Sequence, residues 1–130
     1  MWKFLFSLAI VSSATAQPGV AADGDPVTGK KVFGRCAACH LLDQERHAVG
    51  PYLRGIVGRP IASVSTFKYS SALTKYAEGG RVWDENSLAT FLHSPKKAVP
   101  GTRMGFAGLK NDQEIRDLIT YLSRPQGGVE

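Results

Sequence analysis

Two cysteines and a histidine stand close together in the run Cys36-Ala37-Ala38-Cys39-His40, and these are the only two cysteines among 130 residues. On a helix, residues three apart lie about one turn from each other on the same face. Two thiols at this spacing can bond to two neighbouring groups along one edge of a flat ligand. The imidazole beside them can then reach a metal at the centre of that ligand, because a neutral ring nitrogen is a metal donor.

The pattern Cys-X-X-Cys-His is typical of c-type haem attachment, in which the histidine also binds the iron. Three alternatives compete with it. A structural zinc site needs about four nitrogen and sulfur ligands, but no second cysteine pair is present. A thioredoxin-like redox pair needs a βαβ context that the sequence does not indicate. A plain disulfide, or a chance spacing, is the third alternative.

The second axial ligand of such an iron has three candidates, namely Met104, His47 and His93. Met104 is the only methionine besides Met1, and it lies in a glycine-rich stretch from Pro100 to Gly108. A lone methionine is more often a flexible core residue than a ligand. The residue types and spacing alone therefore leave the second ligand open.

The N-terminal residues have the layout of a secretory signal peptide. Lys3 is the only charge in residues 1–16, and it is followed by an apolar stretch from Phe4 to Val11 and by Ala14-Thr15-Ala16. We expect cleavage near Ala16, with a site at Val20-Ala21-Ala22 and an uncleaved anchor as alternatives. Export favours haem, because c-type attachment takes place outside the cytoplasm.

Composition limits the size and class of the protein. The chain has 16 Lys plus Arg against 11 Asp plus Glu, a net charge of +5 that falls to +4 without Lys3. This length predicts one domain, and two cysteines exclude a multi-disulfide scaffold. No apolar run of about 18 residues follows the leader, so we expect no membrane anchor in the mature chain. A modest positive charge without a binding motif gives no support for nucleic-acid binding.

Four short helices are predicted from capping residues and apolar spacing. The expected N-caps are Asp25, Ser70, Asp84 and Asn111. Apolar residues at helical spacing follow each of them, and the second, third and last helices should end near Gly79, before Pro95 and before Pro125.

The first of these helices is expected to continue through His40, because Gly29, Phe33, Cys36 and His40 recur on one face. Nothing alternates over enough residues to predict a sheet. Residues 41–68 and 94–110 are expected loops that are too long to lack a purpose in a compact domain. A bound cofactor would organise them from within.

These motifs, in the order in which they follow one another along the chain, resemble those of class I cytochrome c, the type shared by mitochondria and α-proteobacteria. The resemblance runs from Asp25 to Arg124 and rests on Gly29-Lys30-Lys31-Val32-Phe33, Cys36–His40, Val49-Gly50-Pro51-Tyr52-Leu53, Gly58-Arg59, Phe67-Lys68-Tyr69-Ser70, Val82-Trp83-Asp84-Glu85, Ser94-Pro95-Lys96-Lys97, Pro100 to Gly108 and Tyr121-Leu122. It implies an all-α fold in which three to five short helices and long loops wrap around one covalently bound haem. The implied boundaries are a signal peptide at 1–16, a lead at 17–24, the cytochrome c domain at 25–124 and a tail at 125–130.

The resemblance also implies the iron ligands and their immediate surroundings. Haem c is held by Cys36 and Cys39 through two thioethers, and its iron is held by His40 and Met104. His/Met ligation raises the potential of the iron. The carbonyl of Pro51 is expected to accept a hydrogen bond from Nδ1 of His40 and so to set its tautomer.

Further haem contacts follow from the same resemblance. Arg59, Tyr69 and Trp83 match donors to a buried propionate, an anion that must be hydrogen-bonded in a low dielectric. The remaining predicted contacts are Leu53, Leu92 and Phe106 on the ring, Thr102 near the inner propionate or a neighbouring water, and Phe91. Many members carry tyrosine at the position of Phe91 and asparagine at that of Leu73, so the Met104 side is expected to be drier here. His47 is expected to form a structural hydrogen bond, and His93 to lie on a solvated helix face.

A haem with both axial positions filled by protein has no open position for a substrate, so the resemblance implies a one-electron carrier and no enzyme. We expect a periplasmic monomer that shuttles electrons between respiratory or photosynthetic partners. The alternatives are a haem enzyme or gas sensor with a labile Met104, and an electron-entry subunit of a larger complex. Acidic redox proteins or membrane redox complexes are the expected partners, because basic residues flank the two ligand segments: Lys30, Lys31, Arg35, Lys96, Lys97, Arg103 and Lys110.

Overall fold

The structure, a computed structural model, describes residues 24–125, so the predicted signal peptide and most of the predicted tail lie outside the described residues. The helices are α1 (Pro26–Phe33), α2 (Ser71–Tyr76), α3 (Glu85–His93), α4 (Pro95–Ala98) and α5 (Asp112–Leu122). No strand forms in this range, where Pro60 and Val82 make a single isolated bridge. The prediction of an all-α fold with three to five short helices is confirmed.

Capping side chains begin the four longer helices where the sequence predicts them. Asp25, Ser70, Asp84 and Asn111 each accept a hydrogen bond from a backbone N–H in the first turn of α1, α2, α3 and α5, respectively. These bonds satisfy donors that have no partner inside the helix. None of the helices within residues 24–125 combines the length and hydropathy of a membrane span.

The first helix is shorter than predicted, because α1 ends at Phe33 and not at His40. Beyond it, the N–H groups of Arg35, Cys36 and Cys39 bond to the carbonyls three residues earlier. This is the tighter pattern of 3₁₀-type turns. It alternates with bonds from the N–H groups of Ala37 and His40 to the carbonyls four residues earlier, so no regular helix continues. The cysteine pair therefore lies on a run of turns that continues from the helix.

A second difference concerns the segment 94–110, which was expected to be a loop but contains α4. Pro95 does follow the end of α3, as predicted, but it also opens the next helix at the first helical position. The same residue serves both purposes, because proline cannot extend a preceding helix yet suits a first turn.

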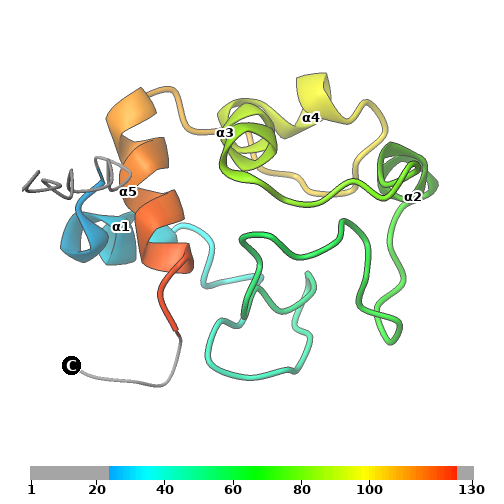
Figure 1. The fold of residues 1–130 in the computed structure, drawn as a ribbon, viewed down its shortest axis with the longest axis horizontal. Coiled ribbons are helices and arrows are strands. Elements are labelled where there is room, and N and C mark those ends of the chain that lie inside the picture. Colours follow the sequence, from blue (N-terminus) through cyan, green and yellow to red (C-terminus); the bar gives the residue numbers. More distant parts are fainter. Residues whose placement is uncertain (1–23, 126–130) are drawn as a thin grey trace, which may run out of the picture.

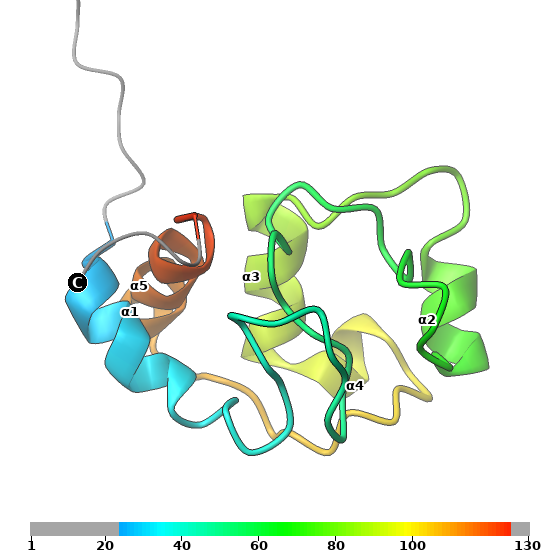
Figure 2. The same cartoon turned by 90° about the horizontal axis from the view of Figure 1, so that it is seen from below.

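The two terminal helices pack across each other at one end of the molecule (Figures 1 and 2), and α1 and α5 are in contact. Gly29 permits the approach, since a β-carbon there would collide with the Asp117 carbonyl and the Tyr121 side chain. The Phe33 and Tyr121 rings lie 5.8 Å apart, and Leu118 is fully buried at 0% exposure. Glycine thus brings the backbones together, as expected for this crossing.

The core continues from this crossing into the rest of the molecule, since α5 also contacts α3 and α3 contacts α4. Buried side chains of α1, α3 and α5 join residues of the long segment 41–68 in a single cluster that includes Leu42, Ile56 and Ile61. Figure 1 shows that long segment beneath α3, between the crossing and α2. A few short helices thus hold two long connecting segments in place.

Candidate haem-binding site

The two cysteines are free thiols, both of them half-buried, on the turns that follow α1. The Cys36 carbonyl accepts hydrogen bonds from the N–H of Cys39 at 3.0 Å and from that of His40 at 2.9 Å. Burial raises the pKa of the Cys36 thiol, although the adjacent Arg35 guanidinium opposes this shift. The turn therefore fixes the two thiols and the imidazole relative to one another.

The His40 ring is oriented by a hydrogen bond between its Nδ1 and the Pro51 carbonyl, at 2.7 Å. A carbonyl can only accept, so Nδ1 carries the proton and Nε2 keeps its lone pair for a metal. Burial lowers the pKa of His40, which favours this neutral form, while the Pro51 bond acts in the opposite direction. The hydrogen bond expected between these residues is present, and its part in iron ligation remains a prediction.

Gly50 brings the chain back against the His40 ring. Its N–H bonds to the Cys39 carbonyl at 2.8 Å, and a β-carbon at Gly50 would collide with the imidazole. Gly50 stands directly before Pro51, but its residue type and spacing predict no separate role for it. The spacing along the chain cannot reveal this close approach, because the contact depends on how the 41–50 loop folds.

Met104 is half-buried and packs against the hydrophobic core from the segment between α4 and α5. Its N–H donates to the Thr102 hydroxyl at 3.2 Å. Gly108 adopts a φ of 107°, and a β-carbon there would collide with the His93 carbonyl at the end of α3. Glycine is therefore required at this end of the segment.

The three predicted propionate donors gather around Arg59. The backbone N–H of Trp83 bonds to the Arg59 carbonyl at 2.9 Å, and Tyr69 lies close enough to interact electrostatically with the guanidinium. The guanidinium donates to the Tyr52 and Arg54 carbonyls, each at 2.9 Å, while its Nε is buried without a partner. Burial lowers the pKa of Arg59, but an arginine stays charged at neutral pH.

The predicted ring contacts are divided between buried and half-buried positions. Trp83, Phe91 and Leu92 are buried, and the Trp83 and Phe91 rings lie 5.1 Å apart. Leu53, Leu73, Met104 and Phe106 are only half-buried and pack against the same core. These half-buried apolar side chains offer surface to a large apolar ligand.

The two remaining histidines occupy the environments that we expected. His47 contacts the Thr66 hydroxyl through Nε2 at 2.7 Å and stacks on the Tyr52 ring, with centroids 5.6 Å apart. His93 is exposed at the end of α3, where its carbonyl accepts a hydrogen bond from Lys110. Neither Tyr52 nor Thr66 was singled out from the sequence, since their contacts join distant loops.

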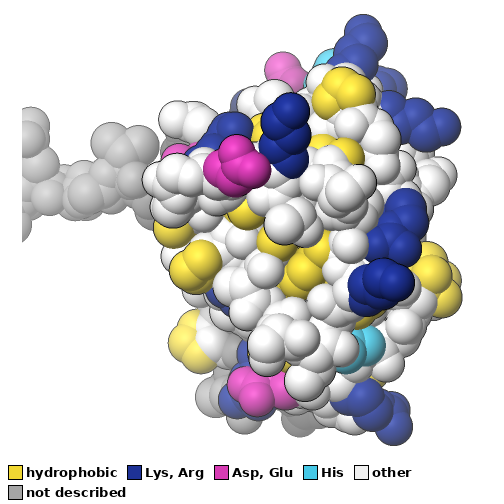
Figure 3. Space-filling model, turned by 90° about the vertical axis from the view of Figure 1, so that its right-hand side faces the viewer, with side chains coloured by type: hydrophobic (Ala, Val, Ile, Leu, Met, Phe, Trp, Pro, Cys, Tyr) yellow, Lys and Arg dark blue, Asp and Glu magenta, His cyan; other side chains and the backbone are white. Residues whose placement is uncertain are grey.

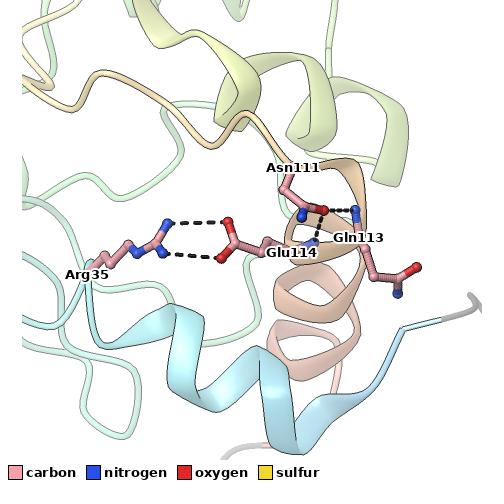
Figure 4. A network of polar contacts seen from close by, with 4 residues as sticks. All are labelled: Arg35, Asn111, Gln113 and Glu114. Atoms are coloured by element: carbon pink, nitrogen blue, oxygen red, sulfur yellow. Dashed lines mark hydrogen bonds and ion pairs between the residues drawn. The ribbon is translucent and has the colours of Figure 1, made fainter.

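An ion pair joins the cysteine segment to the last helix (Figure 4). The Arg35 guanidinium donates to both Glu114 carboxylate oxygens, at 3.1 and 3.3 Å, and the Asn111 side chain caps the same end of α5. Because two guanidinium nitrogens bond to two carboxylate oxygens, the pair fixes the relative orientation of the two side chains as well as bringing their opposite charges together. The turn that carries Cys36 is thereby attached to α5.

Taken together, these residues fit haem c. They offer two free thiols, an imidazole with an available Nε2, a thioether, and a partly buried guanidinium with one unpartnered nitrogen. A haem needs these donors together with apolar walls, and the half-buried side chains supply such walls.

Known proteins are similar to this chain in sequence. Residues 26–124 match the cytochrome c family. Cytochrome c2 of Rhodomicrobium vannielii is 41% identical over 120 residues, which cover 92% of this chain and 90% of that one. A cytochrome c homolog of Rickettsia felis is 38% identical over 130 residues, which cover 90% of this chain and 73% of the relative.

A solved structure is also similar to this chain. Cytochrome cH from Methylobacterium extorquens superposes with a TM-score of 0.69 at 39% identity, covering 76% of this chain and 97% of that chain. The chain therefore belongs to the class I cytochrome c family and is an electron-transfer protein rather than an enzyme.

Proposed function

We propose that this chain is a periplasmic one-electron carrier with a single haem c, attached through Cys36 and Cys39 and ligated by His40 and Met104. When bound, the haem supplies an iron that alternates between the ferrous and ferric states. The protein's own task is to hold that iron's surroundings nearly unchanged while the charge changes.

The observation that best supports this proposal is the hydrogen bond from His40 to the Pro51 carbonyl. It leaves Nε2 as the donor nitrogen and prevents the ring from rotating away, and the half-buried thiols lie on the same short turn. The Gly50 backbone lies directly against the imidazole, so the orientation of the ring is fixed before any metal binds. A ligand fixed in this way needs little rearrangement when the iron changes oxidation state.

Arg59, Tyr69 and Trp83 are proposed to neutralise a haem propionate. An anion moved out of water needs compensating donors, and the unpartnered Nε of Arg59 is a buried donor that such a carboxylate would satisfy. Leu53, Leu92, Phe91 and Phe106 are proposed to exclude water from the ring, with Thr102 holding the Met104 backbone.

The proposed partners are acidic redox proteins or membrane redox complexes. Lys30, Lys31, Lys96 and Lys97 are exposed, and no hydrogen bond or ion pair joins their side chains to another residue in the range 24–125. Figure 3 shows that Lys and Arg side chains also outnumber Asp and Glu at the α2 end of the molecule, so positive charge is not confined to these four residues. Arg35 adds little to such a surface, because Glu114 neutralises it.

Covalent attachment is the first property to test. Haem should remain with the polypeptide after denaturation and extraction with acidified acetone, because thioether bonds survive conditions that break coordination. Cys36→Ser and Cys39→Ser should each leave one bond, and the double variant should release its haem into the organic layer. Free extraction from the parent protein would refute the attachment, and with it the proposed function.

A further inference from the structure

The segment that carries Met104 is held firmly at its two ends. At its start, the Thr102 N–H bonds to the Val99 carbonyl at 3.0 Å, and Val99 is buried. At its far end, the Leu109 N–H bonds to the Leu92 carbonyl at 2.8 Å, and the Lys110 ammonium donates to the His93 carbonyl at 2.7 Å. Leu109 is 1% exposed, so this end lies in the core.

Between these two ends, the backbone has very little support. Within the described chain, residues 103–108 form no hydrogen bond from backbone to backbone. The Met104 N–H reaches only the neighbouring Thr102 hydroxyl, and Gly105 has open space around it. A segment with few backbone bonds and exposed surface opens at low free-energy cost.

One side chain crosses from the first residue of this unsupported stretch, directly before Met104, to another part of the fold. The Arg103 guanidinium donates to the Lys68 carbonyl at 3.0 Å, joining residues 35 apart in the sequence. Figures 1 and 2 show the connection between α4 and α5 running beside α2, close to where the chain enters that helix. Gly101 and Ala72 are close neighbours there, as a β-carbon on Gly101 would lie 3.2 Å from that of Ala72.

The accepting carbonyl belongs to a well-held loop. Tyr69, directly after Lys68, accepts a hydrogen bond from the Val64 N–H at 3.2 Å, and its ring packs against Phe67 at 5.0 Å. Ser70 then caps α2. The Arg103 bond therefore ties the residue directly before Met104 to a well-held neighbour.

We propose that Arg103 is a positioning residue for Met104, which it keeps in place through the Lys68 carbonyl. This inference rests on the proposed ligation of iron by Met104. Loss of the bond should let the segment open more often, and each opening would expose the iron to an external ligand. Arg103 would then have an internal task, distinct from that of a free surface cation for partner docking.

Ligand exchange on the ferric holoprotein tests this inference. Imidazole is mixed with the protein at constant pH, and the loss of the weak sulfur-to-iron band at the near-infrared edge is followed by stopped flow. In Arg103→Ala, the exchange rate should rise about fivefold, a factor equivalent to about 1 kcal/mol, the net value of a typical hydrogen bond. Arg103→Lys keeps a donor and a charge, so its rate should stay within about twofold of the parent.

Lys75→Ala is the matched control, since it removes one exposed positive charge whose side chain forms no hydrogen bond or ion pair within residues 24–125. Its exchange rate should equal that of the parent. Equal rates for Arg103→Ala and Lys75→Ala, or a rate for Arg103→Lys as high as that for Arg103→Ala, would overturn the positioning role. Met104→Ala separates the two proposals: if the parent has no sulfur-to-iron band and Met104→Ala binds imidazole no faster than the parent, the ligation itself is wrong.

Discussion

The thioether of Met104 separates an electron carrier from a haem protein with an open iron position. Met104→Ala should yield a ferric iron that binds water and a ferrous iron that binds carbon monoxide, because no other described side chain is proposed for that side. Met104→His should keep a low-spin iron but lower the potential by on the order of 0.1 V or more, within the roughly 0.8 V range that axial ligands span.

Absorption spectra and a potentiometric titration measure these outcomes. His93→Ala is a suitable control, because His93 is exposed at the end of α3 and should leave both the spectrum and the potential unchanged. An unaltered spectrum and potential in Met104→Ala would show that another residue is the ligand.

Individual residues differ in how far the sequence could predict them. Cys36, Cys39 and His40 follow from a local motif, and Pro51 follows from family resemblance, with its hydrogen bond present at 2.7 Å. Gly50 could not be predicted, since its constraint comes from the imidazole of a residue ten positions earlier. Local chemistry is visible in a sequence, whereas contacts across a folded loop are not.

At the scale of elements, the crossing of α1 and α5 depends on Gly29. Gly29→Ala should destabilise the holoprotein by about 2 kcal/mol, because an added methyl group in a tight contact costs about 1–3 kcal/mol. The gain in helix propensity returns at most about 1 kcal/mol. The obstacle is the Asp117 backbone, which cannot rotate away as a side chain would.

Denaturant unfolding measures this change. Gly34→Ala is the control, because Gly34 is exposed, has a helical φ of −50° and leaves about 3.0 Å between a new β-carbon and the Lys31 carbonyl. Its unfolding midpoint should be unchanged or slightly raised. Similar losses in both variants would mean that the crossing does not require a glycine.

The cap of α3 gives a prediction about pH. Hydrogen bonds from Ser87 lower the pKa of Asp84 below its usual value near 3.8. A lowered folded-state pKa means that the carboxylate contributes stability above the unfolded-state value, and that this contribution disappears as pH falls through the folded-state value. Asp84→Ala should therefore have a lower unfolding midpoint at pH 6, and its difference from the parent should shrink below about pH 4.

Asp84→Asn separates capping from charge, since an asparagine oxygen still accepts from the Ser87 N–H. Its midpoint should remain between those of the parent and Asp84→Ala, and the pH dependence attributed to this carboxylate should be gone. A difference between the parent and Asp84→Ala that stays constant from pH 6 to pH 3 would contradict the role of the ionised carboxylate.

The elements also show where local signals fail. Capping residues located the starts of four helices correctly, because an N-cap bond involves only neighbours in sequence. The end of α1 was misjudged, because the apolar spacing of a run of turns resembles that of a helix, while the backbone hydrogen bonds there mix spans of three and four residues. α4 was missed, because Pro95 signals both the end of one helix and the start of another.

At the scale of the whole molecule, the sequence predicted the fold through family resemblance and not through its physics alone. Residues 41–68 contain no helix, and within that range the chain is held by scattered bonds such as the one between the Leu53 N–H and the Leu41 carbonyl. No local pattern specifies such a path. Burial of Leu42, Ile56 and Ile61 in a common core is a property of the complete chain.

The arrangement of charge over the whole surface yields the final prediction. Lys97 and Lys75 are both exposed and carry one charge each, but Lys97 lies in α4, before the Met104 segment, and Lys75 lies in α2. The bimolecular rate of reduction of the ferric protein by ferrocyanide, an anionic one-electron reagent, should fall steeply as ionic strength rises. Steering by exposed charges is screened beyond about 8 Å at physiological salt.

Lys97→Glu should slow this reaction several-fold at low salt and flatten its salt dependence, whereas Lys75→Glu, with the same change in net charge, should do much less. Equal effects of the two reversals would mean that net charge governs the encounter, and that the basic residues beside the ligand segments form no docking surface.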